Sequence, residues 1–189
     1  MRSLLRHLAK IIYKVCTINS QTKHTFSRYA MYESIRTSFP LEPKIGNALS
    51  ILYSKNLLDL VGFECLSPTE INYPEGSIFN IESENERFDI IVSDQVLEHI
   101  DGNPSDAIKE LLRVLKPGGI MLHTTCMLVP VHGEDDFWRF TLNGLRTLIE
   151  SCGAECLMSA GAGHPIQFLF NLTGWSHLST PINRMHPFN

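Results

Sequence analysis

The chain has 189 residues, of which 43% are hydrophobic and 19% charged, the usual composition of one globular domain with a single sizeable core. Its formal net charge of -4 argues against a nucleic-acid partner, because contacts with phosphates require a basic face. The five cysteines have no CxxC spacing, which favours a reducing compartment over a disulfide framework or a zinc site.

Residues 1–16 are expected to form a basic amphipathic helix, since apolar side chains share one helical stripe and an arginine or lysine recurs every four residues on another. Charges interrupt the apolar run, so it is neither the core of a signal peptide nor a membrane span. Such a helix suits a peripheral membrane contact, and the alternative is that it docks on the domain. A polar connection follows, with a helical turn or two over residues 29–38. We therefore expect two parts, residues 1–47 and 48–189.

Strands and helices are expected to alternate from residue 48 onward. The expected strands span residues 48–52, 64–70, 78–81, 88–94, 120–126 and 155–159, and the expected helices span residues 56–61, 105–116 and 142–151. This alternation implies a parallel sheet with right-handed crossovers. The interval between residues 70 and 78 is too short for a helical crossover of about a dozen residues, so the sheet should be shortened around its second and third strands.

The stretch from Phe88 to Gly119 is the most informative part of the sequence. Its apolar run ends in Ser93 and Asp94, as expected for a buried parallel strand whose carboxyl end opens onto a crevice. Apolar residues then recur with helical spacing. Lys116 is expected to give the last helical turn its positive charge, before a proline and two glycines end the helix.

Two motifs in this stretch, DQVLEH over residues 94–99 and LLRVLKPGG over residues 111–119, resemble class I S-adenosylmethionine-dependent methyltransferases of the small-molecule type, similar to methyltransferase type 11. The resemblance covers residues 48–160. It implies an α/β, Rossmann-like fold, with a mostly parallel twisted sheet flanked by helices and an antiparallel last strand for which residues 165–172 are the candidate. It also implies S-adenosyl-L-methionine as cofactor, and methyl transfer to a small molecule or to a glycan or lipid intermediate.

The first strand-to-helix turn departs from this family. Ligand-binding turns normally use glycine so that the backbone can approach the ligand, whereas residues 52–55 read LYSK. Ser54 could donate a hydrogen bond to the cofactor and Lys55 could neutralise its methionyl carboxylate. The alternative is a turn that has lost its ligand. About 20 residues further on, Glu70 has the spacing of a ribose-binding acid, with Glu75 as its competitor.

The resemblance assigns further residues to the cofactor. It places Asn80 beside the adenine amino group, and it places Asp94, Gln95 and Val96 on the methionyl and sulfonium side. Acids, amides and histidines are not needed for packing at a buried strand end, which favours a ligand-binding role for the polar cluster that begins at Asp94.

Residues 123–141, rich in histidines, acids and aromatics, correspond in the resemblance to the acceptor side. His132 and Asp136 are the candidate catalytic residues, and the candidate substrate-binding residues are His99, Trp138 and Arg139. His99 has a second interpretation as a buried structural histidine, Trp138 as core or pocket wall, and Arg139 as a partner of Asp135 or of an anionic substrate. A metal ion is not expected, because two ligands would share a helix face only if His132 and Asp136 were helical across Gly133.

The sequence therefore predicts a cytoplasmic methyltransferase, with a peripheral membrane contact through residues 1–16 as a possible addition. Catalysis would rest on positioning, and a general base would matter only for a hydroxyl or phenol acceptor. The competing hypothesis is a non-catalytic binding or scaffolding protein that retains the fold and has lost the cofactor. The acceptor and the oligomeric state are not indicated by the sequence.

Overall fold

The computed structural model describes residues 7, 21–39, 45–162 and 179–181, and it divides the chain into two units. The first unit comprises residues 1–34 and 162–189, where β1 (Gln21–Thr25) pairs antiparallel with β6 (Ser179–Pro181). Helix α2 (Phe26–Ser38) follows β1 and confirms the helix expected over residues 29–38. Apart from residue 7, the predicted helix over residues 1–16 lies outside the described residues, as does the candidate strand over residues 165–172.

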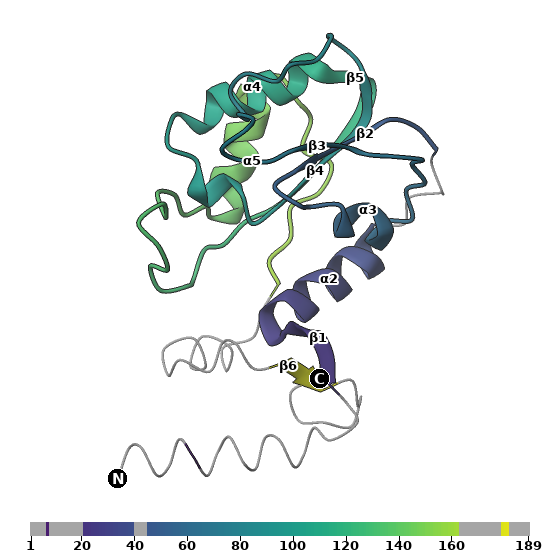
Figure 1. The fold of residues 1–189 in the computed structure, drawn as a ribbon. Helices are drawn as coiled ribbons and strands as arrows, with labels where there is room; N and C mark the ends of the chain where they lie inside the picture. Colours follow the sequence, from purple (N-terminus) through teal and green to yellow (C-terminus); the bar gives the residue numbers. More distant parts are fainter. Residues whose placement is uncertain (1–6, 8–20, 40–44, 163–178, 182–189) are drawn as a thin grey trace. The chain divides into compact units, whose positions relative to one another are not determined.

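The second unit, residues 35–161, is built on a four-stranded parallel sheet (Figure 1). Its strands lie in the order β3 (Thr69–Ile71), β2 (Ala48–Ile51), β4 (Phe88–Asp94) and β5 (Leu115–Thr124). The carboxyl ends of all four strands lie at the same edge of the sheet, because the pairing is parallel throughout. This is the Rossmann-like sheet that the sequence predicted.

Helices flank this sheet: α3 (Asn56–Leu60), the short 3-10 helix η1 (Leu97–His99), α4 (Pro104–Val114) and α5 (Leu142–Ser151). Helix α4 begins where the Asn103 side chain accepts a hydrogen bond from the Ser105 backbone, and Pro104 occupies its first turn. It contacts β5, and α5 packs against α4, so the two helices lie together over the sheet (Figure 1). No helix among the described residues is both long and apolar enough to cross a membrane.

The core explains why the central strand and helix were predictable. The side chains of Phe88, Ile90, Ile91 and Val92 are at most 1% exposed, as a strand buried on both faces requires. The apolar face of α4 belongs to one core cluster with Phe88 and Ile91, and its residues Ala107, Ile108 and Leu111 are fully buried. Burying one such aliphatic side chain stabilises the fold by roughly 1.5–3 kcal/mol.

Two predicted strands are wrong. Residues 78–81 form an isolated antiparallel bridge between Ser77 and Asn80, and their apolar signal arises because Ile78 and Ile81 pack into the core from a turn. Residues 155–159 form no strand. Their large apolar side chains, Leu157 and Met158, are 69% and 38% exposed, so there is no apolar face for a neighbouring strand to bury.

Three other elements begin or end elsewhere than predicted. The strand expected over residues 64–70 is confined to β3, with a separate bridge between Ile45 and Glu64. Helix α4 ends at Val114 and β5 begins at Leu115 rather than at residue 120, so Lys116 does not belong to the last turn of the helix. Lys116 lies in β5, and its ammonium group binds both carboxylate oxygens of Asp89 on β4 at 2.9 and 2.8 Å. This ion pair lowers the pKa of Asp89.

Candidate cofactor and acceptor site

The turn after β2 contains no glycine, yet two of its residues adopt the left-handed backbone conformation that glycine usually occupies. Leu52 and Tyr53 both have left-handed backbones, with φ of 51° and 59°. The end of β3 holds them there, because the Leu52 amide donates to the Ile71 carbonyl (2.9 Å) and the Tyr53 amide donates to the Asn72 side-chain oxygen (3.2 Å). Left-handed backbone costs a non-glycine residue about 1–2 kcal/mol. Such strain persists only where surrounding contacts enforce it.

Ser54 joins this turn to the end of β4. Its hydroxyl donates to the Ile51 carbonyl and accepts a hydrogen bond from the Asp94 amide at 2.8 Å, and its side chain is buried. The hydroxyl hydrogen predicted for the cofactor is therefore used inside the protein, and the residue positions the turn. Lys55 is exposed at the start of α3.

Asn72 is a site residue that the sequence analysis missed. Glu70 and Glu75 are exposed, and the Glu70 side chain makes no hydrogen bond to the turn in the described part of the chain, whereas the Asn72 side chain does. The alternation of side chains along a strand could have indicated Asn72. Residues two apart point to the same face, so Asn72 continues the face of Glu70 just beyond the end of β3. Asn80 is exposed, with its amide bound to the Ser77 carbonyl at 3.3 Å.

The end of β5 positions the end of β4. The Thr124 hydroxyl donates to the Asp94 carboxylate at 2.6 Å, and the Gln95 amide donates to the Thr124 carbonyl at 3.0 Å. Gln95 is the third left-handed residue at this edge of the sheet, with φ of 58°. Val96 points its side chain into the core and is 2% exposed. Asp94 and Gln95 are thus fixed beside the strained turn.

Glu98 connects this edge of the sheet to the acceptor loop, residues 125–141. It is fully buried, and its carboxylate accepts from the Thr125 hydroxyl at 2.8 Å. In the side-chain orientation of Gln95 that satisfies both its amide oxygen and its NH2 group, this NH2 group donates to the other Glu98 oxygen at 3.1 Å. Its backbone carbonyl accepts from the amides of Phe137 (2.8 Å) and Trp138 (3.0 Å). The sequence analysis gave Glu98 no role, although a glutamate inside an apolar motif was a signal for one.

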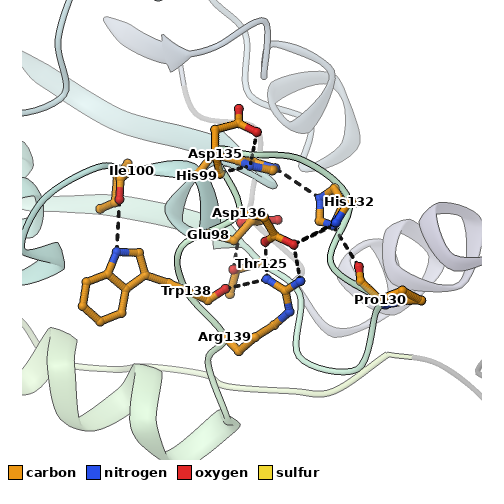
Figure 2. Close-up of polar contacts among 10 residues, drawn as sticks. All are labelled: Glu98, His99, Ile100, Thr125, Pro130, His132, Asp135, Asp136, Trp138 and Arg139. Atoms are coloured by element: carbon orange, nitrogen blue, oxygen red, sulfur yellow. Dashed lines mark hydrogen bonds and ion pairs between the residues drawn. The ribbon is translucent and has the colours of Figure 1, made fainter.

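Asp136 and Arg139 form the central ion pair of the acceptor loop (Figure 2). The Arg139 guanidinium binds both carboxylate oxygens of Asp136, whose side chain is covered, and it also donates to the Trp138 carbonyl at 2.8 Å. Arg139 therefore pairs with Asp136 rather than with Asp135. The guanidinium holds the pKa of Asp136 far below its usual range, and the carboxylate in turn raises the pKa of Arg139.

His132 and His99 meet above this ion pair. The amide and the Nδ1 atom of His132 each lie 3.1 Å from Oδ2 of Asp136, and Nδ1 of His99 lies 3.0 Å from the Asp135 carbonyl. Their Nε2 atoms are 3.3 Å apart (Figure 2). Trp138 belongs to the same loop, and its indole N–H donates to the Ile100 carbonyl at 3.0 Å. All five residues predicted for the acceptor side are therefore found in one neighbourhood.

Two further titratable groups near these strand ends are uncharged. His123 on β5 meets the Ser93 hydroxyl through Nδ1 at 2.6 Å, and burial lowers the pKa of His123 to about 4. Burial, with the nearby Glu98 carboxylate, raises the pKa of the Cys126 thiol to about 11. Neither is a nucleophile or general base near neutral pH.

The parallel sheet and the polar strand ends define a class I methyltransferase-type α/β domain. Residues 36–123 match the family described as methyltransferase domain. No curated protein sequence matches the chain.

Solved structures share the fold. A chain of the complex between the Trm112 methyltransferase activator and a methyltransferase from Haloferax volcanii has a TM-score of 0.53 at 13% identity, over 68% of this chain and 69% of its own. A methyltransferase from Bacillus halodurans has a TM-score of 0.51 at 15% identity, over 65% of each chain. The [4+2]-cyclase SpnF has a TM-score of 0.50 at 16% identity, over 71% of this chain and 62% of its own. The match covers less than two thirds of several of these structures, and these likenesses show the fold alone.

Proposed function

We propose that the domain binds S-adenosyl-L-methionine at the carboxyl ends of β2, β3 and β4, and that it transfers the methyl group to an acceptor held by the acceptor loop. The observation that carries this proposal is the strained turn at Leu52 and Tyr53. Tyr53 is 69% exposed, so packing of its side chain does not account for its left-handed backbone. Strain of this kind is retained at functional sites, and this edge of a parallel sheet is where ligands bind.

The residues around the turn have the chemistry that this cofactor requires. Lys55 is an exposed cation for the methionyl carboxylate, and Asp94 and Gln95 are polar groups beside it. Glu70 and Asn72 face the ribose side in the proposal, and Asn80 faces the adenine. When bound, the cofactor supplies a methyl group already activated by the sulfonium. The chain then needs only to hold an acceptor nucleophile in line with that methyl group.

His132 is the proposed general base for a hydroxyl acceptor. Its Nδ1 atom faces the Asp136 carboxylate, so Nε2 is the nitrogen that can take a proton, and the side chain is 45% exposed. His99 lies opposite, and Trp138 offers an aromatic wall. We propose a small molecule, or a glycan or lipid intermediate, as the acceptor class. Arg139 is committed to Asp136, so in this proposal it orients Asp136 and does not bind an anionic acceptor.

The two-part organisation and the membrane contact belong to the same proposal. Residues 1–47 would precede a methyltransferase-like domain over residues 48–189, and the basic stripe of residues 1–16 would contact an anionic lipid surface. Sedimentation with anionic vesicles tests this contact. Binding that persists after the four basic residues of the stripe are changed to glutamine would contradict it; these are Arg2, Arg6, Lys10 and Lys14.

Calorimetric titration of the whole chain with S-adenosyl-L-methionine and its demethylated product tests the central proposal. Saturable binding is expected, and Asp94→Ala should weaken it by about 1–3 kcal/mol through loss of a charge-assisted contact. If the folded wild-type chain does not bind at millimolar concentration, the competing non-catalytic hypothesis is favoured. The likeness to a [4+2]-cyclase illustrates that this fold does not dictate one reaction.

A further test addresses the acceptor loop. Incubation of the protein with labelled cofactor and cell extract identifies a methylated acceptor. His132→Ala should then reduce turnover while cofactor affinity stays close to that of the wild type, the pattern of a residue that acts on the acceptor. Unchanged turnover in this variant would exclude His132 as the base.

A further inference from the structure

In the imidazole rings of His99 and His132, the Nδ1 atoms have hydrogen-bond acceptors as partners, whereas the two Nε2 atoms face only one another. Nδ1 of His99 faces the Asp135 carbonyl at 3.0 Å. Nδ1 of His132 faces the Pro130 carbonyl at 3.2 Å and Oδ2 of Asp136 at 3.1 Å. Carbonyl and carboxylate oxygens only accept hydrogen bonds, so both Nδ1 atoms carry hydrogen. Each neutral ring then has its lone pair on Nε2.

These two lone pairs face one another. The Nε2 atoms are 3.3 Å apart, the rings are nearly perpendicular at 88°, and their centroids are 5.0 Å apart. If the two rings pointed straight at one another through their Nε2 atoms, their centroids would be farther apart than 5.0 Å. The two Nε2 atoms therefore point toward one another at an angle. Two lone pairs at this distance repel unless a cation lies between them. The arrangement therefore calls for a shared proton or a metal ion.

The spacing fits a metal ion. Zn–N bonds of about 2.0–2.1 Å and a tetrahedral angle place two nitrogen ligands roughly 3.3–3.4 Å apart. The observed Nε2 separation of 3.3 Å lies in this range. It is longer than the 2.7–3.2 Å range, with a mode of about 2.9–3.0 Å, of protein N–H···O hydrogen bonds, which disfavours the shared proton.

The surroundings of the two rings are those of metal-binding histidines. Such histidines donate their second ring N–H to a carboxylate or a backbone carbonyl, which fixes the tautomer and the ring orientation. His132 does so to the Pro130 carbonyl, with the Asp136 carboxylate 3.1 Å from the same Nδ1 atom, and His99 does so to the Asp135 carbonyl (Figure 2). Arg139 fixes the Asp136 carboxylate from its other side. Potential ligand atoms of His99, His132 and Asp136 all lie within 4.8 Å of one another.

We propose that His99 and His132 bind a divalent transition-metal ion of the zinc class through their Nε2 atoms, with Asp136 positioning His132. The two side chains are 24% and 45% exposed, so solvent can reach an ion there and open coordination positions remain. Those positions suit water or the oxygen of an acceptor. With the metal bound, Nε2 of His132 is a ligand and no longer the base, and the ion itself lowers the pKa of the acceptor hydroxyl. The metal site does not depend on the proposed methyl transfer, whereas activation of an acceptor by the metal ion rests on it.

Titration of the metal-free whole chain with ZnCl2 tests the site. One ion is expected per chain, and His99→Ala and His132→Ala should each weaken binding at least about tenfold. The control His7→Ala, which removes an exposed histidine of the first unit, should bind like the wild type. Circular dichroism verifies that each variant is folded.

A measurement on the wild type guards against misfolded variants. Co²⁺ bound by nitrogen and oxygen ligands gives visible bands that report its geometry, and a sulfur-to-metal charge-transfer band reveals binding by cysteine. The site is overturned by a charge-transfer band, by the absence of Zn²⁺ binding to the folded wild type, or by wild-type affinity for Zn²⁺ in both histidine variants. Titration with S-adenosyl-L-methionine in metal-free buffer is read separately. Its failure would refute the proposed function and leave the metal site standing.

Discussion

Replacing Tyr53 by glycine tests whether the turn after β2 is strained. The substitution should release about 1–2 kcal/mol, the cost of a left-handed backbone for a non-glycine residue. It should also cost about 0.5–1 kcal/mol, because glycine loses more conformational freedom on folding. The side chain is 69% exposed, so little buried surface is lost. The net result is a stability between unchanged and about 1.5 kcal/mol higher.

Leu66→Gly is the matched control, because Leu66 is fully exposed and is not among the left-handed residues. This change should cost the usual 0.5–1 kcal/mol, roughly. The two variants should therefore differ by about 1–2 kcal/mol in urea denaturation, with the m-value unchanged. Equal destabilisation by both substitutions would refute the strain. Cofactor titration of Tyr53→Gly should show affinity that is retained, since glycine keeps the same backbone path.

The remaining predictions concern the two sides of the site. Asn72→Ala should weaken cofactor binding by about 0.5–1.5 kcal/mol through the turn that it holds, and calorimetry should show a smaller loss for Glu70→Ala. Burial lowers the pKa of His123 to about 4, so as the pH drops from about 6.5 to about 4 the unfolded chain takes up a proton at this histidine and the folded chain does not. Stability should therefore fall over this pH range. His123→Gln should reduce this pH dependence of the stability measured by urea denaturation. Arg139→Ala should destabilise the protein more than Arg139→Lys, because it leaves the covered Asp136 carboxylate without its partner; equal midpoints would contradict this.

The sequence predicted those elements whose signal is local. The limits of α5 match the predicted helix, and β4 and α4 were recognisable because burial imposes a continuous apolar run on one and a helical period on the other. The same reasoning wrongly predicted a strand at Ile78 and Ile81. Two nearby apolar residues give the same sequence signal in a strand and in a turn that packs on the core.

The site was harder to predict because its contacts join distant segments. His99 and His132 are 33 residues apart, so no motif spacing could show that their rings face one another. Spacing along a single helix could not reveal this pair, because the two histidines come from different segments. The choice between Asp135 and Asp136 as the partner of Arg139 likewise depended on which carboxylate the loop turns inward, and adjacent acids in irregular backbone carry no period from which to decide.

The motif DQVLEH links the two sides of the site through its backbone as much as through its side chains. The left-handed Gln95 ends β4 and turns the chain into η1, so Asp94 stays at the sheet edge while Glu98 points inward. The buried Glu98 then binds the Gln95 amide group on one side and, through its carbonyl, the acceptor loop on the other. Any shift of the acceptor loop must therefore disturb hydrogen bonds of a buried carboxylate or its backbone, which is costly in a low-dielectric interior. This coupling gives the proposed acceptor residues a fixed distance from the proposed cofactor residues, the requirement for catalysis by positioning.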